Sequence, residues 1–574
     1  MLRSQLPKIK GYHLLGVAGR GQFGRVLCAY HIASRSLVAL KELDKYRFPT
    51  HKLLRELRFL IGLDHPNIAK CFTLLHTDFN RYLVLEYCEA GTLRDLMQCS
   101  DWLTGRQRIQ LVIDLLKGLA YAHKLQIVHC DVKPENVLLQ LGADGWVVKV
   151  SDFGIAHLQA ETEQHSGSRT GSPAYMAPER FYGKFSLSSD LYAVGIILYE
   201  LFTQERPFQG SVEELMTAHL NQRLPNIDKL PAPLQGIVLK ALAKLPAQRY
   251  DSAEAMILAL EKAIADLPNL DTPCAPATIP APAPIWQLPA PINAMTAVPE
   301  KRLLVAIANQ LQIIDLANLA DKSQWISQKL LVTPHLIQSI VRVADYLFVQ
   351  TGQALLRCSL SNPSDALSLY QTSQENREYT VVIAPNGSWF AIASGSTLEI
   401  RSLRHRKSCQ LILPEREITA VQALDNHYLI CAIRKLSDSA NRLVFLTRRG
   451  HVLGKLALPQ PAKQIVKSYT PYRVVVLLAT AVPALLLVDL LPYRALRIPL
   501  PFAPRFGIAT VWGYAIASDL VLMLLDLMGQ SIGNIEFPEP IVAVAAIGLR
   551  ELAVAEGDKL YVFNITELGV DLIF

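Results

Sequence analysis

Polar side chains able to carry out phosphoryl transfer are grouped in one part of the chain. Asp131, Lys133 and Asn136 lie within the stretch His-Cys-Asp-Val-Lys-Pro-Glu-Asn, and Asp152 follows in Ser-Asp-Phe-Gly. Carboxylate and amide oxygens are ligands that Mg²⁺ prefers, and this ion neutralises phosphate oxygens. The residue types and their spacing therefore predict a site that moves a phosphoryl group.

A glycine-rich segment upstream of these residues is suited to covering a nucleotide. Its sequence, Gly-Arg-Gly-Gln-Phe-Gly-Arg-Val, occupies residues 19–26. A dinucleotide-binding loop with the same glycine spacing would continue into a helix. Residues 26–30 and 37–41 are instead rich in β-formers and are separated by a short turn. The favoured interpretation is a loop between two strands, in which glycines let the backbone approach phosphates without a Cβ clash.

Lys41 ends the second of these strands, in the sequence Val-Ala-Leu-Lys, where it could hold phosphate oxygens. A lysine in that role needs an anion to orient its ammonium group. Glu42 would point to the other face of the strand. Glu56 lies in an amphipathic helix expected over residues 50–62. We therefore expect an ion pair between Lys41 and Glu56.

Taken together, these motifs resemble those of a protein kinase. Residues 11–262 are similar to the eukaryotic-like serine/threonine protein kinases of bacteria, with further matches in Ser-Asp-Phe-Gly and in the sequence Gly-Ser-Pro-Ala-Tyr-Met-Ala-Pro-Glu at 171–179. The resemblance implies a bilobal α+β kinase fold over residues 9–265. It also implies ATP as co-substrate, Mg²⁺ or alternatively Mn²⁺ as the metal ion, and serine or threonine hydroxyls of proteins as acceptors.

The resemblance also gives each matched residue a role. Asp131 would accept the proton of the substrate hydroxyl, and Lys133 would hold the γ-phosphate. The residues implied in catalysis are Lys41, Glu56, Asp131 and Lys133, and the implied metal ligands are Asn136 and Asp152. The residues implied in nucleotide binding are Gly19, Gly21, Phe23, Gly24, Val26, Ala39, Lys41, Glu86 and Cys88. Within this set, the carbonyl of Glu86 and the amide of Cys88 would hydrogen bond adenine.

Cys130 departs from the kinase pattern, which usually has arginine between this histidine and aspartate. In the family, that arginine pairs with a phosphorylated activation loop. Cysteine cannot form this pair, so we expect activity that does not depend on phosphorylation of the loop hydroxyls, Thr162, Ser166, Ser168 and Thr170. The thiol could alternatively respond to redox conditions, but a neutral filler is the favoured interpretation.

Further matched residues are expected to hold the site together. The hydroxyl of Ser172 would contact the catalytic aspartate, which again favours serine/threonine specificity. Glu179 would pair with a buried arginine, for which Arg249 is the match, and Asp190 would brace the backbone of the catalytic loop. The roles of Glu179, Arg249 and Asp190 are expected to be structural rather than catalytic.

The C-terminal half repeats a pattern of two apolar strands joined by a short turn. The pairs begin at residues 303, 346, 389, 428, 474, 514 and 551. A spacing of this size is typical of four-stranded propeller blades. We therefore predict an all-β, WD-repeat-like propeller over residues 293–574 with seven blades. Six or eight blades are the alternatives, because the Trp-Asp and Gly-His marks of WD repeats are missing.

No metal-binding cluster or carboxylate pair recurs along these repeats, so a platform that binds a protein partner or recruits substrates is expected. A sensor of a small ligand is the alternative. The segment 266–292 is rich in proline and alanine and predicts a semi-extended linker between the two domains. Binding of this linker by a proline-recognising domain is the less favoured interpretation.

Composition and charge restrict the partners, metal sites and compartment that the sequence predicts. The net charge of +7 is spread along the chain, which argues against a nucleic-acid-binding arm. Nine scattered cysteines without a Cys-x-x-Cys pair argue against zinc and favour a reducing compartment, so a cytoplasmic location is expected. The apolar run at 474–488 contains Pro483 and is too short to span a bilayer, which argues against a membrane receptor kinase.

The main rival is a catalytically inactive pseudokinase that acts as a scaffold. Such proteins usually lack one or more residues of the phosphoryl-transfer machinery. All of them are present here, namely Lys41, Glu56, Asp131, Asn136 and Asp152. The sequence therefore favours an active enzyme, and leaves its substrates, the ligand of the propeller and the oligomeric state open.

Overall fold

The computed structural model describes most of the chain. The described residues are 7–21, 24–34, 36–43, 60–77, 80–98, 103–142, 145–153, 172–265, 278–316, 327–372, 379–403, 408–413, 416–437, 440–478 and 483–568. The chain divides into two compact units. The first comprises residues 1–275 and 489–497, and the second comprises 276–488 and 498–574.

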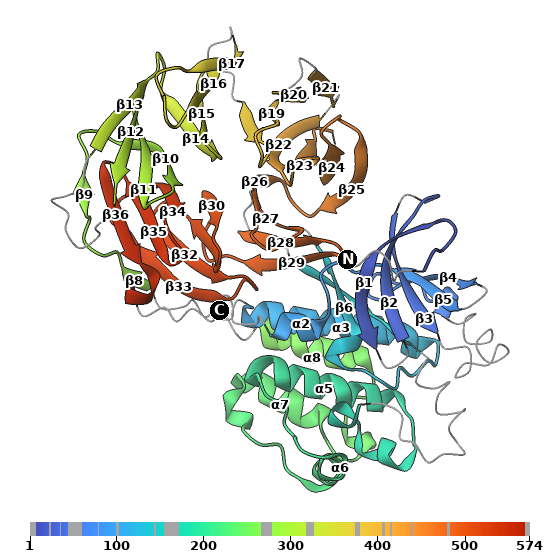
Figure 1. The fold of residues 1–574 in the computed structure, drawn as a ribbon. Helices are drawn as coiled ribbons and strands as arrows, with labels where there is room; N and C mark the ends of the chain where they lie inside the picture. Colours follow the sequence, from blue (N-terminus) through green and yellow to red (C-terminus); the bar gives the residue numbers. More distant parts are fainter. Residues whose placement is uncertain are drawn as a thin grey trace. The chain divides into compact units, whose positions relative to one another are not determined.

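The first unit begins with a five-stranded antiparallel sheet in the order β1-β2-β3-β5-β4 (Figure 1). Its strands are β1 (Tyr12–Gly21), β2 (Gly24–His31), β3 (Ser36–Leu43), β4 (Cys71–His76) and β5 (Arg81–Glu86). Strands β1 and β2 pair up to Gly21 and Gly24, so the described glycines lie in two paired strands, as the sequence predicted. Gly24 has φ of +141°, and a Cβ there would lie 2.6 Å from the carbonyl oxygen of Glu42. A side chain at this position is therefore excluded.

Helices make up most of the rest of the first unit. They are α2 (Leu93–Met97), α3 (Gly105–Lys124), α5 (Leu187–Thr203), α6 (Val212–Asn221), α7 (Ala232–Ala241) and α8 (Ala253–Ala265). The hairpin of β6 (Val137–Leu141) and β7 (Trp146–Val150) packs against α3. Short 3-10 turns stand at η3 (Pro134–Asn136), η4 (Pro173–Tyr175) and η5 (Pro178–Tyr182).

The sheet and the helices have separate apolar cores, as a bilobal fold requires. Residues such as Leu27, Leu40 and Val84 fill the core of the sheet. The helical core is built around α3 and α5, and α5 is apolar on nearly every side because other elements surround it. A helix that is hydrophobic all round is typical of the centre of a domain. The side chain of Asp190 is an exception inside α5, and its role is described below.

A buried histidine in the helical part makes the stability of the first unit depend on pH. His219 in α6 is fully buried, its Nδ1 lies 2.8 Å from the hydroxyl of Tyr192, and Lys244 donates to its carbonyl. Burial, and secondly the charge of Lys244, lower the pKa of His219 from 6.5 to about 4. The folded protein keeps this imidazole neutral, whereas the unfolded chain takes up a proton below its ordinary pKa.

The contribution of His219 to stability is therefore fully present above about pH 6.5 and is lost as the pH falls towards 4, by an amount on the order of 3 kcal/mol. His219→Gln keeps an acceptor for Tyr192 but cannot be protonated. We expect the unfolding temperature of the wild type to fall more steeply than that of His219→Gln between pH 6.5 and 4.5. Parallel curves in calorimetry would contradict this assignment.

Among its described residues, the C-terminal half contains seven sheets, six with four strands and one with five (Figure 1). The first three consist of β10 (Ile292–Val298), β11 (Arg302–Ile307), β12 (Gln310–Asp315) and β13 (Ser327–Val332); β14 (Ile337–Val343), β15 (Tyr346–Thr351), β16 (Ala354–Ser359) and β17 (Leu367–Gln371); and β18 (Thr380–Ile383), β19 (Trp389–Ser394), β20 (Thr397–Ser402) and β21 (Ser408–Ile412). The fourth and fifth consist of β22 (Arg416–Ala423), β23 (Tyr428–Lys435), β24 (Asn441–Thr447) and β25 (Val452–Leu458); and β26 (Ala462–Lys467), β27 (Arg473–Leu478), β28 (Ala484–Leu490) and β29 (Tyr493–Pro499).

The last two sheets each include a short strand from the start of the second unit. The sixth consists of β30 (Phe506–Ala509), β31 (Gly513–Ala517), β32 (Val521–Asp526) and β33 (Ser531–Glu536), with β8 (Thr278–Pro280) added in parallel. The seventh consists of β34 (Ile541–Ala546), β35 (Glu551–Glu556) and β36 (Lys559–Asn564), completed by β9 (Trp286–Gln287).

Strands β8 and β9 lie in the segment that was expected to be a linker. The second unit begins at Pro276 rather than at the expected residue 293. Without β9, the backbone N–H and C=O groups along the outer edge of β36 would be unpaired. Strand β9 pairs with part of that edge. Proline, which lacks a backbone N–H, is tolerated at such an edge, and β8 ends in Pro280. A proline-rich composition thus concealed two short edge strands.

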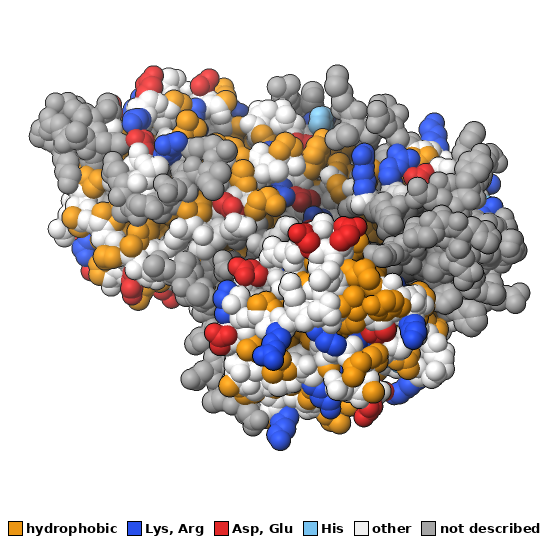
Figure 2. All heavy atoms as spheres, turned by 90° about the horizontal axis from the view of Figure 1, so that it is seen from below, with side chains coloured by type: hydrophobic (Ala, Val, Ile, Leu, Met, Phe, Trp, Pro, Cys, Tyr) orange, Lys and Arg blue, Asp and Glu red, His pale blue; other side chains and the backbone are white. Residues whose placement is uncertain are grey.

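The apolar run at 474–488 forms β27 and β28, which are neighbours in the fifth sheet, with Pro483 directly before β28. The two buried neighbouring strands predicted for this run are confirmed, and residues 479–482 between them lie outside the described residues. Within the ranges given above, none of the helices combines the length and apolar character needed to cross a membrane. On the face shown in Figure 2, basic and acidic side chains are interspersed.

Candidate active site

The backbone of the catalytic loop is held by Asp190 from helix α5. Its carboxylate accepts hydrogen bonds from the backbone N–H of His129 at 2.8 Å and of Cys130 at 3.0 Å. His123 Nε2 lies 2.9 Å from the same carboxylate. Burial alone would raise the pKa of Asp190, but the hydrogen bonds and charges of the two histidines outweigh it, so the pKa is lowered. Asp190 therefore stays ionised and braces the loop, as expected from the sequence.

The side chains predicted around Asp131 come together in the structure. Its Oδ2 lies 2.7 Å from Lys133 Nζ and accepts a hydrogen bond of 2.9 Å from Asn136 Nδ2. Its Oδ1 accepts a hydrogen bond of 3.1 Å from the backbone N–H of Ser172, whose hydroxyl is 3.0 Å from Lys133 Nζ. The carboxylate is thus held from two sides, by the catalytic loop and by the end of the activation segment.

Lys41 and Asp152 form a short ion pair with Nζ and Oδ1 2.6 Å apart, and the side chain of Lys41 is almost fully buried. The next residue, Phe153, is buried and its ring lies 4.6 Å from that of His129. This contact fixes the position of Asp152 relative to the catalytic loop. Glu56, the expected partner of Lys41, lies outside the described residues, so that ion pair stays a prediction.

The donor set near Asp131 is suitable for a divalent cation that also binds phosphates. Asn136 donates through Nδ2 to Asp131, so its amide oxygen is the atom that could contact a cation. Asp152 would supply a carboxylate oxygen. The described residues contain no cluster of three or more His, Cys, Asp or Glu side chains placed for metal binding. A cation with only these two protein ligands fits Mg²⁺, which keeps waters and takes its remaining ligands from substrate phosphates.

Most of the predicted nucleotide-binding residues lie on three neighbouring strands. Gly19 and Gly21 are in β1 and Gly24 and Val26 are in β2, and Val26 is paired with Lys41 of β3. Ala39 of β3 is paired with Leu85 of β5, and β5 ends at Glu86, two residues before Cys88. Phe23 lies outside the described residues.

The side chain of Glu86 is already engaged. Both of its oxygens lie 3.0 Å from Lys149 Nζ, and Gln140 donates to it as well. A contact from Glu86 to a nucleotide would therefore have to come from its backbone, which is the role that was predicted for it.

The end of the activation segment is anchored by the predicted pair of Glu179 and Arg249. Two parallel hydrogen bonds of 2.7 and 2.8 Å join the carboxylate to the guanidinium, which is completely buried. Burial would raise the pKa of Glu179, but the hydrogen bonds from Arg249 and Ser189 outweigh it and lower the pKa. Bidentate pairs of this kind fix both position and orientation.

Cys130 is buried, and its sulfur faces the carbonyl of Val128 at 3.7 Å. Burial, and secondly the charge of Asp190, raise the pKa of the thiol to about 12. The thiol is therefore protonated at neutral pH and is a poor nucleophile. The neutral-filler interpretation is favoured over a redox role.

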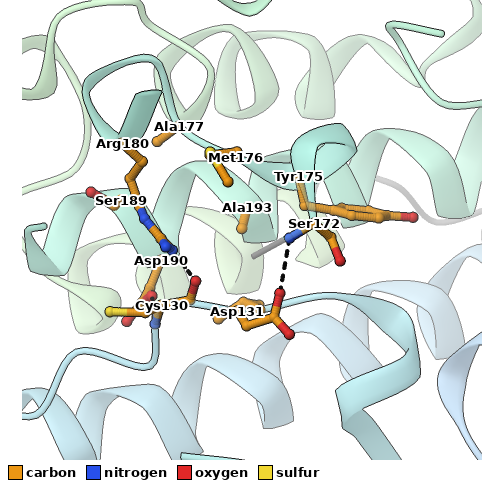
Figure 3. Close-up of a pocket in the computed structure, with 11 residues that line it drawn as sticks. Cys130, Asp131, Ser172, Tyr175, Met176, Ala177, Arg180, Ser189, Asp190 and Ala193 are labelled. Carbon is orange, nitrogen blue, oxygen red and sulfur yellow. Dashed lines mark hydrogen bonds between the residues drawn. The ribbon is translucent and has the colours of Figure 1, made fainter. Parts of the chain in front are cut away.

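Arg180 was not singled out from the sequence, although it directly follows the Ala-Pro-Glu motif. Its Nη1 donates a hydrogen bond to the carbonyl of Cys130. Both residues line a pocket beside Asp131 (Figure 3). Sequence spacing gave no sign of this contact, because the two residues belong to motifs about fifty positions apart.

A second set of side-chain contacts that was not predicted from the sequence surrounds Arg94 of helix α2. Its guanidinium binds Glu135 of the catalytic loop and Glu200 of α5, each at 2.8 Å. Arg94 and Glu200 also contact the hydroxyl of Tyr175, which lies 2.5 Å from Glu200. This network joins α2, η3, η4 and α5. Its members are far apart in sequence and follow no motif, so only the fold reveals it.

Comparisons with known proteins agree with this geometry. Residues 12–258 match the family model described as the protein kinase domain. The chain is 35% identical over 257 residues to the serine/threonine-protein kinase PrkC of Bacillus subtilis, an alignment that covers 43% of this chain and 39% of PrkC.

Two other relatives cover a similar share of this chain. The probable serine/threonine-protein kinase CPE1738 of Clostridium perfringens is 34% identical over 278 residues, or 46% of this chain and 40% of the relative. The serine/threonine-protein kinase RUNKEL of Arabidopsis thaliana is 33% identical over 266 residues, or 46% of this chain and 19% of the relative. The chain thus spans about two fifths or less of the length of these relatives. Residues 12–258 are a protein kinase domain similar to those of bacterial serine/threonine kinases.

Proposed function

We propose that the protein is an ATP- and Mg²⁺-dependent protein kinase that transfers the γ-phosphoryl group to serine or threonine hydroxyls. One observation carries the proposal. Lys133, Asn136 and Ser172 converge on the carboxylate of Asp131. Such a carboxylate, held in a fixed orientation, is what a group that orients a hydroxyl nucleophile requires.

In the proposed mechanism, Asp131 accepts the proton of the substrate hydroxyl. Lys133 is 2.7 Å from this carboxylate, so its ammonium would lie close to the phosphoryl group that the hydroxyl attacks. Lys41 would hold phosphate oxygens, oriented by Glu56. Asn136 and Asp152 would hold Mg²⁺. When bound, this ion would neutralise the phosphate oxygens in the transition state.

Serine/threonine specificity is proposed from the contact between Lys133 and Ser172. Lys133 Nζ donates to the hydroxyl of Ser172 at 3.0 Å. Lys133 contacts Asp131 through its side chain, and Ser172 contacts it through its backbone N–H. We propose that this pair positions a serine or threonine hydroxyl beside the carboxylate of Asp131.

We propose that the C-terminal half is a seven-bladed propeller. The first strands of several successive sheets contact each other, and β10 of the first sheet also contacts β34 of the last, which is the contact that a closed ring requires. The strand β9, from before β10, completes the last sheet, and such a strand ties the two ends of a ring together. As a further part of the proposal, this domain recruits substrates or binds a protein partner, with the small-ligand sensor as the alternative.

We also propose a cytoplasmic location. Seven cysteines among the described residues are free thiols, and most are buried. Unpaired cysteines are typical of reducing compartments.

Incubation of the full-length protein with labelled ATP and Mg²⁺ tests the proposed activity. We expect phosphate to be incorporated into serine or threonine of the protein itself or of a generic protein substrate. If calorimetry shows that the chain is folded and yet no phosphate is incorporated, the inactive scaffold is favoured. Incorporation into tyrosine alone would contradict the proposed specificity.

A further inference from the structure

The peptide that precedes the catalytic aspartate is held in an unfavourable conformation. Cys130 has φ of +70°, a region in which residues other than glycine are disfavoured. The direction in which Asp131 points depends on this backbone, because Asp131 is the next residue. A conformation of this kind persists only when surrounding groups hold it.

Charged side chains hold both polar groups of Cys130. Its N–H donates to Asp190 at 3.0 Å, and its carbonyl accepts a hydrogen bond from Arg180 Nη1. Asp190 is fully buried, so its bond is shielded from water. Hydrogen bonds to charged groups are the stronger kind. Cys130 is thus held on one side from helix α5 and on the other from the turn η5.

Arg180 is itself held in place. Its guanidinium lies 4.8 Å from the centroid of the Phe185 ring, a cation–π contact. In Figure 3 the side chain of Arg180 runs from η5 to the carbonyl of Cys130, and the sulfur of Cys130 points away from Asp131. The thiol takes no part in the contact, which therefore depends on the backbone and on Arg180 alone.

The end of the activation segment consequently contacts the catalytic loop through both Ser172 and Arg180. Ser172 donates its N–H to the carboxylate of Asp131, and Arg180 donates to the carbonyl of the residue before it. Neither contact involves a phosphate. In the sequence, the arginine that would pair with a phosphorylated activation loop is replaced by Cys130.

We propose that Arg180 is a positioning residue for Asp131, and that its bond to the Cys130 carbonyl links the activation segment to the catalytic loop without phosphorylation. The proposal rests on the kinase activity proposed above. Arg180 acts through the backbone and does not contact the reacting groups.

Kinetics of full-length variants test the proposal. Arg180→Ala should lower kcat by about 10- to 100-fold, because small displacements of a catalytic group have effects of this size. Its KM for ATP and its affinity for ATP in calorimetry should stay close to those of the wild type. Arg180→Lys should recover part of the lost kcat, since an ammonium can donate to the same carbonyl. The matched control is Arg223→Ala, at an exposed arginine in the same unit, which should leave kcat unchanged.

Chemical rescue separates positioning from a merely structural role. Adding a small guanidinium compound at millimolar concentration to Arg180→Ala should raise kcat without raising the unfolding temperature. If Arg180→Ala does not fold, Phe185→Leu serves instead, because it removes only the ring beneath the guanidinium. That variant should lower kcat by a smaller factor at unchanged ATP affinity.

Several outcomes would overturn the proposal. One is a kcat of folded Arg180→Ala close to that of the wild type. Another is a loss of activity in Phe185→Leu that simply follows its loss of folded protein. A third is a loss of kcat as large as that of Arg180→Ala when the four residues with loop hydroxyls are replaced by alanine in an otherwise wild-type chain. The link would then depend on a phosphate. An inactive wild type would contradict the proposed kinase function instead.

Discussion

Replacing Asp131 by asparagine is expected to lower the turnover number of the full chain by about 10²- to 10⁴-fold, the usual contribution of a proton acceptor held beside its substrate. Asparagine has nearly the same shape and can still accept the hydrogen bond from the N–H of Ser172. It cannot take up the proton of a hydroxyl, and it loses the ion pair with Lys133. Steady-state kinetics with a phosphate-accepting protein measures the effect.

ATP binding provides the internal control for this variant. Asp131 is bound by Lys133, Asn136 and Ser172, whereas the expected nucleotide contacts lie on β1, β2, β3 and β5. Calorimetry should therefore show an affinity for ATP close to that of the wild type. Asp228→Asn, the same change at an exposed aspartate, should leave turnover unchanged. Wild-type turnover by Asp131→Asn would remove Asp131 from the proposed mechanism.

The largest effect on stability is expected from Arg249→Met. This arginine is completely buried, forms two hydrogen bonds with Glu179 and also donates to the carbonyls of Ala243, Ser188 and Lys244. Removing it leaves the carboxylate of Glu179 without a counter-charge, at a cost of about 3–5 kcal/mol. The unfolding temperature of the first unit should fall by roughly 10 °C, measured by calorimetry at neutral pH.

The destabilisation by Arg249→Met should depend on pH in a defined direction. The folded pKa of Glu179 is lowered in the wild type, so the ion pair contributes stability above the ordinary pKa of 4.5 and loses it as the pH falls. Protonated Glu179 needs no counter-charge, so the variant and the wild type should become more similar at low pH. Arg223→Met is the surface control here, and equal unfolding temperatures of the two methionine variants at neutral pH would contradict the assigned role.

Local patterns in the sequence predicted many features that the structure contains. The seven predicted strand pairs of the C-terminal half are the second and third strands of the seven sheets, from β11–β12 to β35–β36. Their apolar residues and short turns are contiguous in the sequence, so the pattern is visible without the fold. The contact of Glu179 with Arg249 and the bracing by Asp190 were also predicted, because they belong to motifs of the kinase family.

Contacts between distant segments were harder to predict from the sequence. The sequence placed the boundary of the C-terminal domain at residue 293, because prolines and alanines upstream carry no strand pattern. Strands β8 and β9 form only because β33 and β36 have edges that pair with them. The network of Arg94 was missed for a similar reason, since its partners Glu135, Tyr175 and Glu200 are brought together by the packing of four separate elements.

The sequence by itself predicted the chemistry of the site, because phosphoryl transfer restricts which side chains can stand at the positions of Lys41, Asp131, Lys133, Asn136 and Asp152. Through Cys130 it also predicted activity that does not depend on a phosphate on the activation segment. Only the tertiary structure decided what holds the catalytic loop instead. The carbonyl of Cys130 is a backbone group, which no sequence pattern marks, and Arg180 reaches it only because η5 folds back over the loop.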